Sequence, residues 1–212
     1  CWKLGGIAHG WAGPGLLDSY EMERKPVAER TLRQAVANAK LAMEVLSLRR
    51  EQLAAGVAPV QMELPWSARF FAQLGLVLGV AYESDAVLPD DTAVPLASDP
   101  ATDYIQTGRP GHRAPHVWLE SSRSSLDALG EWFTLLTPDV DAWRPQIAQP
   151  WPLRVEALSQ DHADVCGLGP GGALLVRPDG HVAARWHDGP ANDTTLECAL
   201  AAITCPTTAT TT

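Results

Sequence analysis

Residues 84–115 constrain the fold most, because proline and aspartate are concentrated there. The stretch contains five prolines and five aspartates: Pro89, Pro95, Pro100, Pro110 and Pro115, with Asp85, Asp90, Asp91, Asp99 and Asp103. Proline removes a backbone donor, and so polar a stretch has little apolar surface to bury, so neither helix nor sheet is favoured. The pattern predicts an extended linker, placed at 84–111, between two domains of a 212-residue chain.

The segment before this linker has the periodicity of an amphipathic helix. Its apolar residues recur every three to five positions: Val27, Leu32, Val36, Ala39, Met43 and Leu46. This spacing predicts one apolar stripe on a helix over 16–52, which starts after a turn at Pro14. Pro26 is expected to kink this helix or to begin a second one. Residues 66–78 favour a short helix, and residues 78–82 favour a strand.

Beyond the linker, short strands alternate with helices. The predicted elements are strands at 117–119, 132–136 and 153–158, a helix at 140–148, a hairpin of 173–176 with 181–186, and a last helix after a Thr194–Glu197 capping box. Strand, helix, strand, hairpin and closing helix is the order of a thioredoxin-like α/β core, with a parallel first crossover and an antiparallel hairpin. Residues 137–140 open the first helix and contain no cysteine, so the Cys-x-x-Cys motif is lacking and disulfide chemistry is not expected.

Composition narrows the classes of partner and the location. Sixteen Lys and Arg stand against 25 Asp and Glu, a net charge of −9, and no basic cluster is long enough to track phosphates, so nucleic acid is excluded. The longest apolar stretch, within 70–81, is interrupted by Gln73 and two glycines, so no membrane span is expected. Four cysteines lack the spacing of zinc or dithiol sites and favour a reducing, cytoplasmic location: Cys1, Cys166, Cys198 and Cys205.

Three glycines satisfy the spacing G-x-G-x-x-G of dinucleotide-binding loops: Gly167, Gly169 and Gly172. That loop must follow a strand and open a helix, whereas a predicted strand follows Gly172 here. Pro170 also removes one of the backbone donors that a phosphate would use. These glycines are therefore interpreted as a loop that precedes the hairpin.

Other chemistry-bearing residues also lack a supporting context. His112 and His116 have the spacing of a helical metal pair, but Pro115 between them disfavours a helix. Three serines lack the Gly-x-Ser-x-Gly elbow of hydrolases: Ser19, Ser124 and Ser125. The sequon that begins at Asn192 is interpreted as helix-capping chemistry. His162 and His187 are expected to be solvated groups at loop ends.

Several stretches of the sequence resemble one family. Residues 1–4 and 13–28 read CWKL and GPGLLDSYEMERKPVA, and they resemble the region after the flavin site in FAD-dependent aromatic hydroxylases of the para-hydroxybenzoate hydroxylase type. Residues 109–119, 125–127 and 175–182 read RPGHRAPHVWL, SLD and LVRPDGHV. These three stretches are similar to the C-terminal thioredoxin-like domain of family members that act on aromatic polyketides.

The resemblance implies an FAD- and NADPH-dependent monooxygenase that hydroxylates a small aromatic substrate, with polyketides as the narrower class. The FAD motifs of that family, a glycine-rich turn, an Asp-Gly and a Gly-Asp motif, are not matched in this chain, which begins with Cys1 instead of Met. We therefore expect the C-terminal part of such an enzyme, inactive alone, with no catalytic, cofactor-binding or metal-binding residue. Trp2 and Lys3 would lie on the helix that leaves the flavin site, where Trp2 would pack against its neighbours and Lys3 would be a solvated charge.

The expected organisation follows from the linker and the resemblance. Residues 1–83 would be the helical end of the FAD-binding domain, 84–111 the linker, 112–205 a thioredoxin-like domain that folds alone, and 206–212 a disordered tail. Segment 60–82 would border the substrate cavity, and a homo-oligomer is left open. The alternative is an autonomous, redox-dead thioredoxin-like interaction module whose apolar helical stripe binds a partner.

Overall fold

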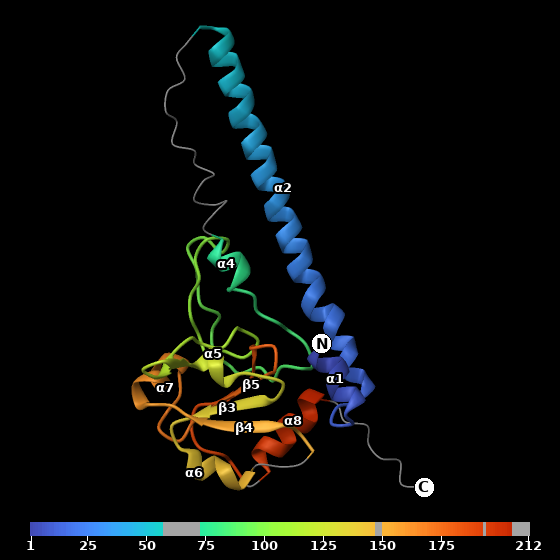
Figure 1. Ribbon diagram of the computed structural model, residues 1–212, viewed down its shortest axis with the longest axis vertical. Helices are drawn as coiled ribbons and strands as arrows, with labels where there is room; N and C mark the ends of the chain where they lie inside the picture. Colours follow the sequence, from blue (N-terminus) through green and yellow to red (C-terminus); the bar gives the residue numbers. More distant parts are fainter. Residues whose placement is uncertain (57–72, 147–149, 193, 205–212) are drawn as a thin grey trace. The chain divides into compact units, whose positions relative to one another are not determined.

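The computed structural model describes residues 1–56, 73–146, 150–192 and 194–204 (Figure 1). Contacts divide the chain into two compact units. The sheet unit comprises Cys1–Glu23, Ala81–Pro95 and Gln106–Thr212, and the helical unit comprises Arg24–Val80 and Leu96–Ile105. This division differs from the predicted boundaries because residues 1–23 and 81–95 pack with the sheet.

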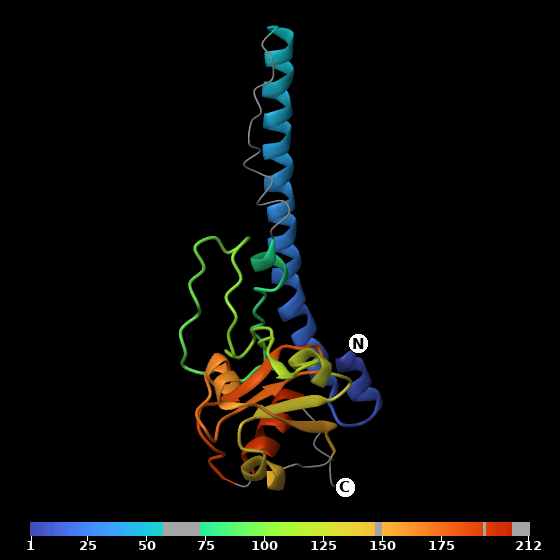
Figure 2. The same cartoon turned by 60° about the vertical axis from the view of Figure 1, so that its left-hand side comes forward.

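A mixed four-stranded sheet forms the centre of the sheet unit (Figure 2). Its strands are β3 (Phe133–Thr137), β4 (Leu153–Ala157), β5 (Ala173–Val176) and β6 (Val182–Trp186), in the spatial order β4-β3-β5-β6. Strands β3 and β4 pair parallel, and β5 pairs antiparallel with both β3 and β6. The predicted parallel crossover and antiparallel hairpin are confirmed.

Both faces of this sheet are buried, because apolar residues follow one another without alternation in its central strands. Leu135 belongs to a core with α8 (Thr195–Thr204), α6 (Val140–Trp143) and the N-terminal Trp11 and Leu16. The next residue, Leu136, belongs to a second core against α7 (Gln160–Cys166). The sheet is therefore the middle layer of an α/β arrangement to which the first residues of the chain contribute.

The ends of two elements follow local sequence signals, and one predicted signal is corrected. The hairpin turns at Gly180, whose φ of +80° requires the freedom of glycine, and Asp139 caps α6 by accepting from the amide of Ala142. The predicted Thr194–Glu197 capping box is not the arrangement at α8. The Asn192 side chain instead accepts the amide of Thr194 at 3.0 Å, so the sequon residue supports the helix start.

Helices precede the sheet in the sequence. Helix α1 spans Trp2–Ala8, a 3-10 turn spans Pro14–Leu17, and α2 spans Asp18–Ala54 without a break. Of the two alternatives expected at Pro26, a second helix is therefore wrong, and a kink stays a prediction. Proline costs a helix one backbone hydrogen bond, and the good helix formers on both sides of Pro26 allow α2 to continue through it.

The apolar stripe predicted on α2 faces solvent. Its residues are exposed by 65% at Leu32, 46% at Val36, 71% at Met43 and 55% at Leu46. Within the helical unit, α4 (Leu74–Val77) packs against the loop before Ile105, where the amide of Leu76 donates to the Ala101 carbonyl at 3.0 Å. The helix predicted at 66–78 lies largely outside the described residues.

Two further sequence predictions are corrected. In place of a strand at 78–82, Ala81 forms one isolated bridge with His112. The strand predicted at 117–119 is β1 (Trp118–Glu120), which pairs only with β2 (Arg123–Ser124) and stands outside the four-stranded sheet.

The sequence analysis missed α5 (Ser125–Ala128), whose capping box joins Ser124 to Asp127. A 3-10 turn at Arg144–Gln146 extends α6. Among the described residues, no helix is both long and apolar enough to cross a membrane.

Candidate functional site

Four ionisable side chains meet inside the sheet unit, and we call them the buried charge cluster: Lys3, Glu23, Arg177 and Asp179. Lys3 lies on α1 and Glu23 on α2, whereas Arg177 and Asp179 belong to the turn between β5 and β6. Strand β5 consists of four fully buried apolar residues, so the chain carries Arg177 directly into the interior. A charge in that place needs partners of opposite sign.

Arg177 is held by two carboxylates. Its two terminal nitrogens donate to both oxygens of Glu23 at 2.6 and 3.0 Å, and its Nε and Nη2 donate to Asp179 at 3.1 and 2.5 Å. The Arg177 side chain is 0% exposed and that of Glu23 is 2% exposed. The remaining Nη1 donor bonds the carbonyl of Ala86 at 3.3 Å, so the planar guanidinium group is satisfied along its whole edge.

Lys3 completes the cluster from α1. Its Nζ donates to Glu23 at 2.8 Å and to the Ser19 hydroxyl at 2.5 Å, and the Ser84 hydroxyl donates to Glu23 at 2.7 Å. The expectation that Lys3 is a solvated charge is wrong, because its side chain is only 6% exposed. Apolar side chains would be enough to pack α1, but the Lys3–Glu23 ion pair also fixes the rotation of α1 about its axis.

The charges of the cluster stabilise one another against the cost of burial. Burial alone would raise the pKa values of Glu23 and Asp179, yet the hydrogen bonds and charge of Arg177 hold both pKa values below their ordinary range. Burial would lower the pKa of Arg177, and its two carboxylates raise it instead. The pKa of Lys3 is lowered, because burial outweighs its bond to Glu23. The carboxylates and the guanidinium group are therefore ionised at neutral pH.

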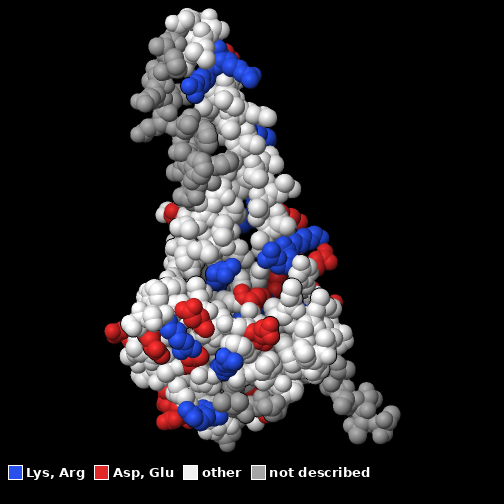
Figure 3. All heavy atoms as spheres, viewed as in Figure 1, with Lys and Arg blue, Asp and Glu red and all other residues white. Residues whose placement is uncertain are grey.

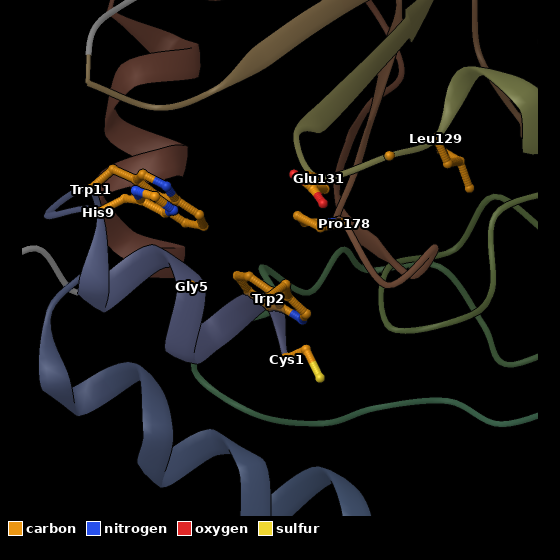
Figure 4. Close-up of a pocket in the computed structure, with 9 residues that line it drawn as sticks. Cys1, Trp2, Gly5, His9, Trp11, Leu129, Glu131 and Pro178 are labelled. Carbon is orange, nitrogen blue, oxygen red and sulfur yellow. The ribbon is translucent and has the colours of Figure 1, made fainter.

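A cavity of about 570 Å³ lies next to this cluster, between α1 and two loops of the sheet unit (Figure 4). Trp2 and Trp11 form part of its wall, with parallel rings whose centroids are 6.3 Å apart. Asp179 accepts a hydrogen bond from the Trp2 indole at 2.9 Å, so the cluster holds one wall of the cavity.

The chemistry of this cavity is that of a binding surface. Glu131, His9 and the free thiol of Cys1 are its side chains with acid–base capacity, and Pro178 and Leu129 add apolar lining. No hydrogen bond or ion pair joins Glu131 to His9 among the described residues, so the geometry offers no paired acid and base. Flat apolar or aromatic groups are what such a cavity can accept.

The glycine-rich loop is closed by its own chain. Gly167 ends α7 with a φ of +70°, and the amide of Gly169 donates to the His187 carbonyl at 2.7 Å. A Cβ on Gly172 would collide with that same carbonyl oxygen. A helix precedes the loop and β5 follows it, which confirms the predicted interpretation. The loop leaves no cradle for a phosphate, so this part of the chain does not fit FAD by itself.

His112 and His116, which have the sequence spacing of a metal pair, have separate surroundings in the structure. His112 lies near the Pro110 carbonyl, whereas the His116 ring packs edge-on against Trp118, so the two are not brought together around one ligand. The described residues contain no group of three or more side chains that could hold a metal ion.

The hydroxyls of two serines bond backbone carbonyls. Ser19 donates to the carbonyl of Leu16 at 2.6 Å, and Ser125 donates to that of Pro115 at 2.8 Å. Ser124 caps α5. His187 is exposed in the loop after β6, with its ring 3.1 Å from the Gly167 carbonyl, so its expected solvation is confirmed. His162 lies on α7, and its buried Nδ1 has no hydrogen-bond partner, so the same expectation is wrong there.

The cysteines differ in environment. Cys166 ends α7, and burial raises the pKa of its thiol to about 11, which disfavours the reactive thiolate. Cys198 lies in the first turn of α8 and is exposed. Cys205 lies outside the described residues.

The buried charge cluster was not predicted from the sequence as a unit. Arg177 and Asp179 fall between the two strands of the predicted hairpin, and Glu23 falls in the predicted helix. A signal existed for Arg177, because a charge directly after a wholly apolar strand is in the interior or at its edge. No local pattern names its partner, since Glu23 lies 154 positions away.

Other charged groups of the sheet unit are also paired. On the face drawn in Figure 3, blue basic and red acidic side chains lie interspersed. Arg123 bonds Glu156 at 2.6 Å, and Arg185 bonds Asp90 at 2.6 Å. Both arginines are therefore paired with carboxylates, which outnumber the basic side chains in this chain of net charge −9.

Known families match both ends of the chain. Residues 107–206 match the family described as aromatic-ring hydroxylase, C-terminal, and residues 1–35 match the FAD binding domain family. The first match contains Arg177 and Asp179, and the second contains Lys3 and Glu23.

Individual relatives are similar over most of this chain. A Streptomyces halstedii protein named as a polyketide hydroxylase is 35% identical over 211 residues, which cover 87% of this chain and 35% of that protein. Aklavinone 12-hydroxylase of Streptomyces purpurascens is 31% identical over 207 residues, 87% of this chain and 34% of the relative. A 4-methyl-5-nitrocatechol 5-monooxygenase of a Burkholderia species is 35% identical, with 88% and 35% covered.

Solved structures agree with these relatives. The flavin-dependent monooxygenase PieE, in complex with FAD and substrate, superposes with a TM-score of 0.77 at 29% identity, covering 97% of this chain and 42% of that one. The chain spans about a third of the length of the curated relatives it matches. The resemblance seen in the sequence is confirmed, and the chain is similar to the C-terminal third of FAD-dependent aromatic and polyketide hydroxylases.

Proposed function

We propose that the chain is the C-terminal portion of an FAD- and NADPH-dependent monooxygenase that hydroxylates a small aromatic substrate. One observation carries the proposal: residues 1–35 match an FAD-binding family, and residues 107–206 match an aromatic-ring hydroxylase family. Aromatic polyketides are the narrower substrate class, supported by the polyketide hydroxylase among the relatives.

The portion by itself is proposed to be inactive. The described residues do not fit FAD, because the loop at 167–172 is closed by its own backbone and no other phosphate-binding glycine loop was found in the sequence. The relatives are about three times as long as the region they share with this chain, which supports cofactor binding by a further part of the protein.

The residues of this chain are proposed to act on architecture. The buried charge cluster joins α1 and the start of α2 to the β5–β6 turn. The cavity beside Trp2 supplies an apolar surface. Segment 60–82 remains our proposed border of the substrate cavity, although residues 60–72 lie outside the described residues. We also retain 1–83, 84–111 and 112–205 as the proposed domain boundaries of the sequence.

The C-terminal region is proposed to be a thioredoxin-like domain without its redox motif. The order β4-β3-β5-β6, with one parallel and two antiparallel pairings, supports this assignment. Residues 137–140 contain no cysteine at the position where redox-active members carry two. A cytoplasmic location is supported by three cysteines that are free among the described residues: Cys1, Cys166 and Cys198.

Purification of the chain tests the proposal directly. The 212-residue protein should carry no flavin and should not accelerate NADPH oxidation, whereas the protein extended upstream of Cys1 should copurify with flavin. Absorbance in the visible flavin band and NADPH consumption with added aromatic substrate are the measurements. Stoichiometric flavin bound to the 212-residue protein alone would contradict the proposed division of labour.

A second candidate is an autonomous interaction module, which the exposed stripe on α2 supports. A homo-oligomer would be one way to cover that stripe. The coding sequence immediately upstream of Cys1 distinguishes the candidates, since a continuous reading frame with a glycine-rich strand–turn–helix favours the enzyme. A stop codon and an initiation site at the first residue would favour the module.

A further inference from the structure

The buried charge cluster connects the two parts of the chain that match different families. Residues Lys3 and Glu23 come from the FAD-binding match, and Arg177 and Asp179 come from the hydroxylase match. Their contacts bridge 154 sequence positions between Glu23 and Arg177. The side chains therefore connect α1 and α2 to a turn that is remote in sequence.

The geometry at Arg177 is directional. A guanidinium group has five N–H donors in one plane, and all five are used: three toward Glu23 and the Ala86 carbonyl, and two toward Asp179. Both oxygens of Glu23 are engaged in parallel bonds, which fixes angle as well as distance. A rotation of α2 by a fraction of a turn would break this pairing.

The connection continues from the turn to α1. Asp179 accepts from the indole Nε1 of Trp2 at 2.9 Å, and the guanidinium carbon of Arg177 lies 5.1 Å from the centre of the Trp2 ring. The next residue, Lys3, bonds Glu23. Trp2 and Lys3 are consecutive on α1 and are thus bonded to two different carboxylates. Helix α1 therefore has one favoured rotation relative to the turn.

We propose that the turn 177–180 is an intramolecular clamp that sets the position of α1 and the first turns of α2, with Arg177 as its positioning residue. The cluster contains two cations and two anions, so its burial is compensated in charge but demands a defined geometry. The clamp assigns a role to the C-terminal region beyond the proposed hydroxylation. It concerns the fold of this chain, and it stands or fails whatever cofactor the longer protein binds.

Hydrogen exchange of the 212-residue protein, followed by mass spectrometry, tests the clamp. Arg177→Gln should speed amide exchange in 2–8 and 18–23 by about tenfold or more beyond any change that it causes in β3 and α8. Arg185→Gln is the matched control, because Arg185 is a largely buried arginine on the same hairpin whose side chain bonds Asp90 and Thr92. Exchange in 2–8 and 18–23 should be unchanged in this control.

Two outcomes would overturn the clamp. One is unchanged exchange in 2–8 and 18–23 of Arg177→Gln, and the other is an equal acceleration in β3 and α8, which would make Arg177 a general stabiliser. If Arg177→Gln fails to fold, Arg177→Lys takes its place, since lysine keeps the charge but cannot bond both oxygens of Glu23 in parallel. Wild-type exchange in Arg177→Lys would also contradict the proposal.

Asp179→Asn tests the arm toward α1 by a separate measurement. The indole N–H resonance of Trp2, assigned by its loss in Trp2→Phe, should shift and exchange faster in Asp179→Asn and should match the wild type in Arg185→Gln. An unshifted Trp2 resonance in Asp179→Asn would overturn the assignment of α1 to the clamp.

Discussion

The buried charge cluster and the apolar stripe of α2 both depart from the usual distribution, in which charged side chains are exposed and apolar ones are buried. In the sheet unit Arg177 and Glu23 have side chains that are 0% and 2% exposed, whereas on α2 Leu32 and Met43 are 65% and 71% exposed. The difference shows that burial follows the presence of a partner. Charges are buried where the chain supplies their counter-charges, and apolar residues stay exposed where the described residues supply no cover.

The largest effect is expected when the sheet unit loses its N-terminal contribution. The sequence predicts that residues 112–205 fold alone, but the contacts favour the opposite result, since Trp11 and Leu16 belong to the core and Glu23 pairs with Arg177. Losing two large apolar side chains costs about 1.5–3 kcal/mol each, and an unpaired buried charge costs about 3–5 kcal/mol. These costs together approach the whole stability of a small domain, so fragment 112–205 should show no cooperative unfolding.

Thermal unfolding followed by circular dichroism is the measurement for this fragment. The intact 212-residue protein serves as its control and should unfold in a cooperative transition. A sharp transition of fragment 112–205 by itself would restore the domain boundary drawn from the sequence.

The next largest effect comes from comparing a buried and an exposed glutamate on α2. Glu23→Gln should lower the free energy of unfolding by about 3–5 kcal/mol, because it leaves Arg177 and Lys3 without their shared carboxylate. Glu29→Gln is the matched control on α2, where the partner Arg33 is 73% exposed and lies 3.9 Å away. Urea unfolding should detect no change in the control, and equal losses in the two variants would remove the contrast.

The response to acid should depend on the same cluster. The folded pKa values of Glu23 and Asp179 are depressed, so their contribution to stability is present above the ordinary values of 4.5 and 3.8 and is lost as the pH falls through the depressed values. Unfolding free energies measured between neutral pH and pH 3 should therefore fall in the acid range. Glu23→Gln should show a shallower fall than the wild type, and identical slopes would argue against a depressed pKa at Glu23.

The smallest effect is expected on the stripe of α2. Met43→Gln removes an exposed apolar side chain and should change the free energy of unfolding by no more than about 0.5 kcal/mol. Leu135→Ala, at a position that is 0% exposed, should cost about 2–5 kcal/mol and calibrates the measurement. A loss of more than 2 kcal/mol in Met43→Gln, or a change of its sedimentation coefficient, would reveal a contact that covers the stripe.

Local signals predicted the part of the fold that depends on short-range chemistry. The turn at Gly180, the cap at Asp139 and the strands β3 to β6 all follow from patterns of a few neighbouring residues. Local rules did not decide between a kink and a second helix at Pro26, where the strong helix formers on either side let α2 continue. They failed at Lys3, because its burial depends on Glu23 and Ser19, whose proximity no periodicity reveals.

The pairing of Glu23 with Arg177 also has a consequence for the order of events during synthesis. The two residues are 154 positions apart, and chains grow at roughly 5–20 residues per second, so Arg177 follows Glu23 after roughly 8–30 s. During that interval nascent α1 and α2 have their carboxylate and ammonium groups but not the guanidinium that neutralises the carboxylate in the interior. Native docking of α1 therefore waits until Arg177 has been translated, and an early segment depends on a residue made 154 positions later.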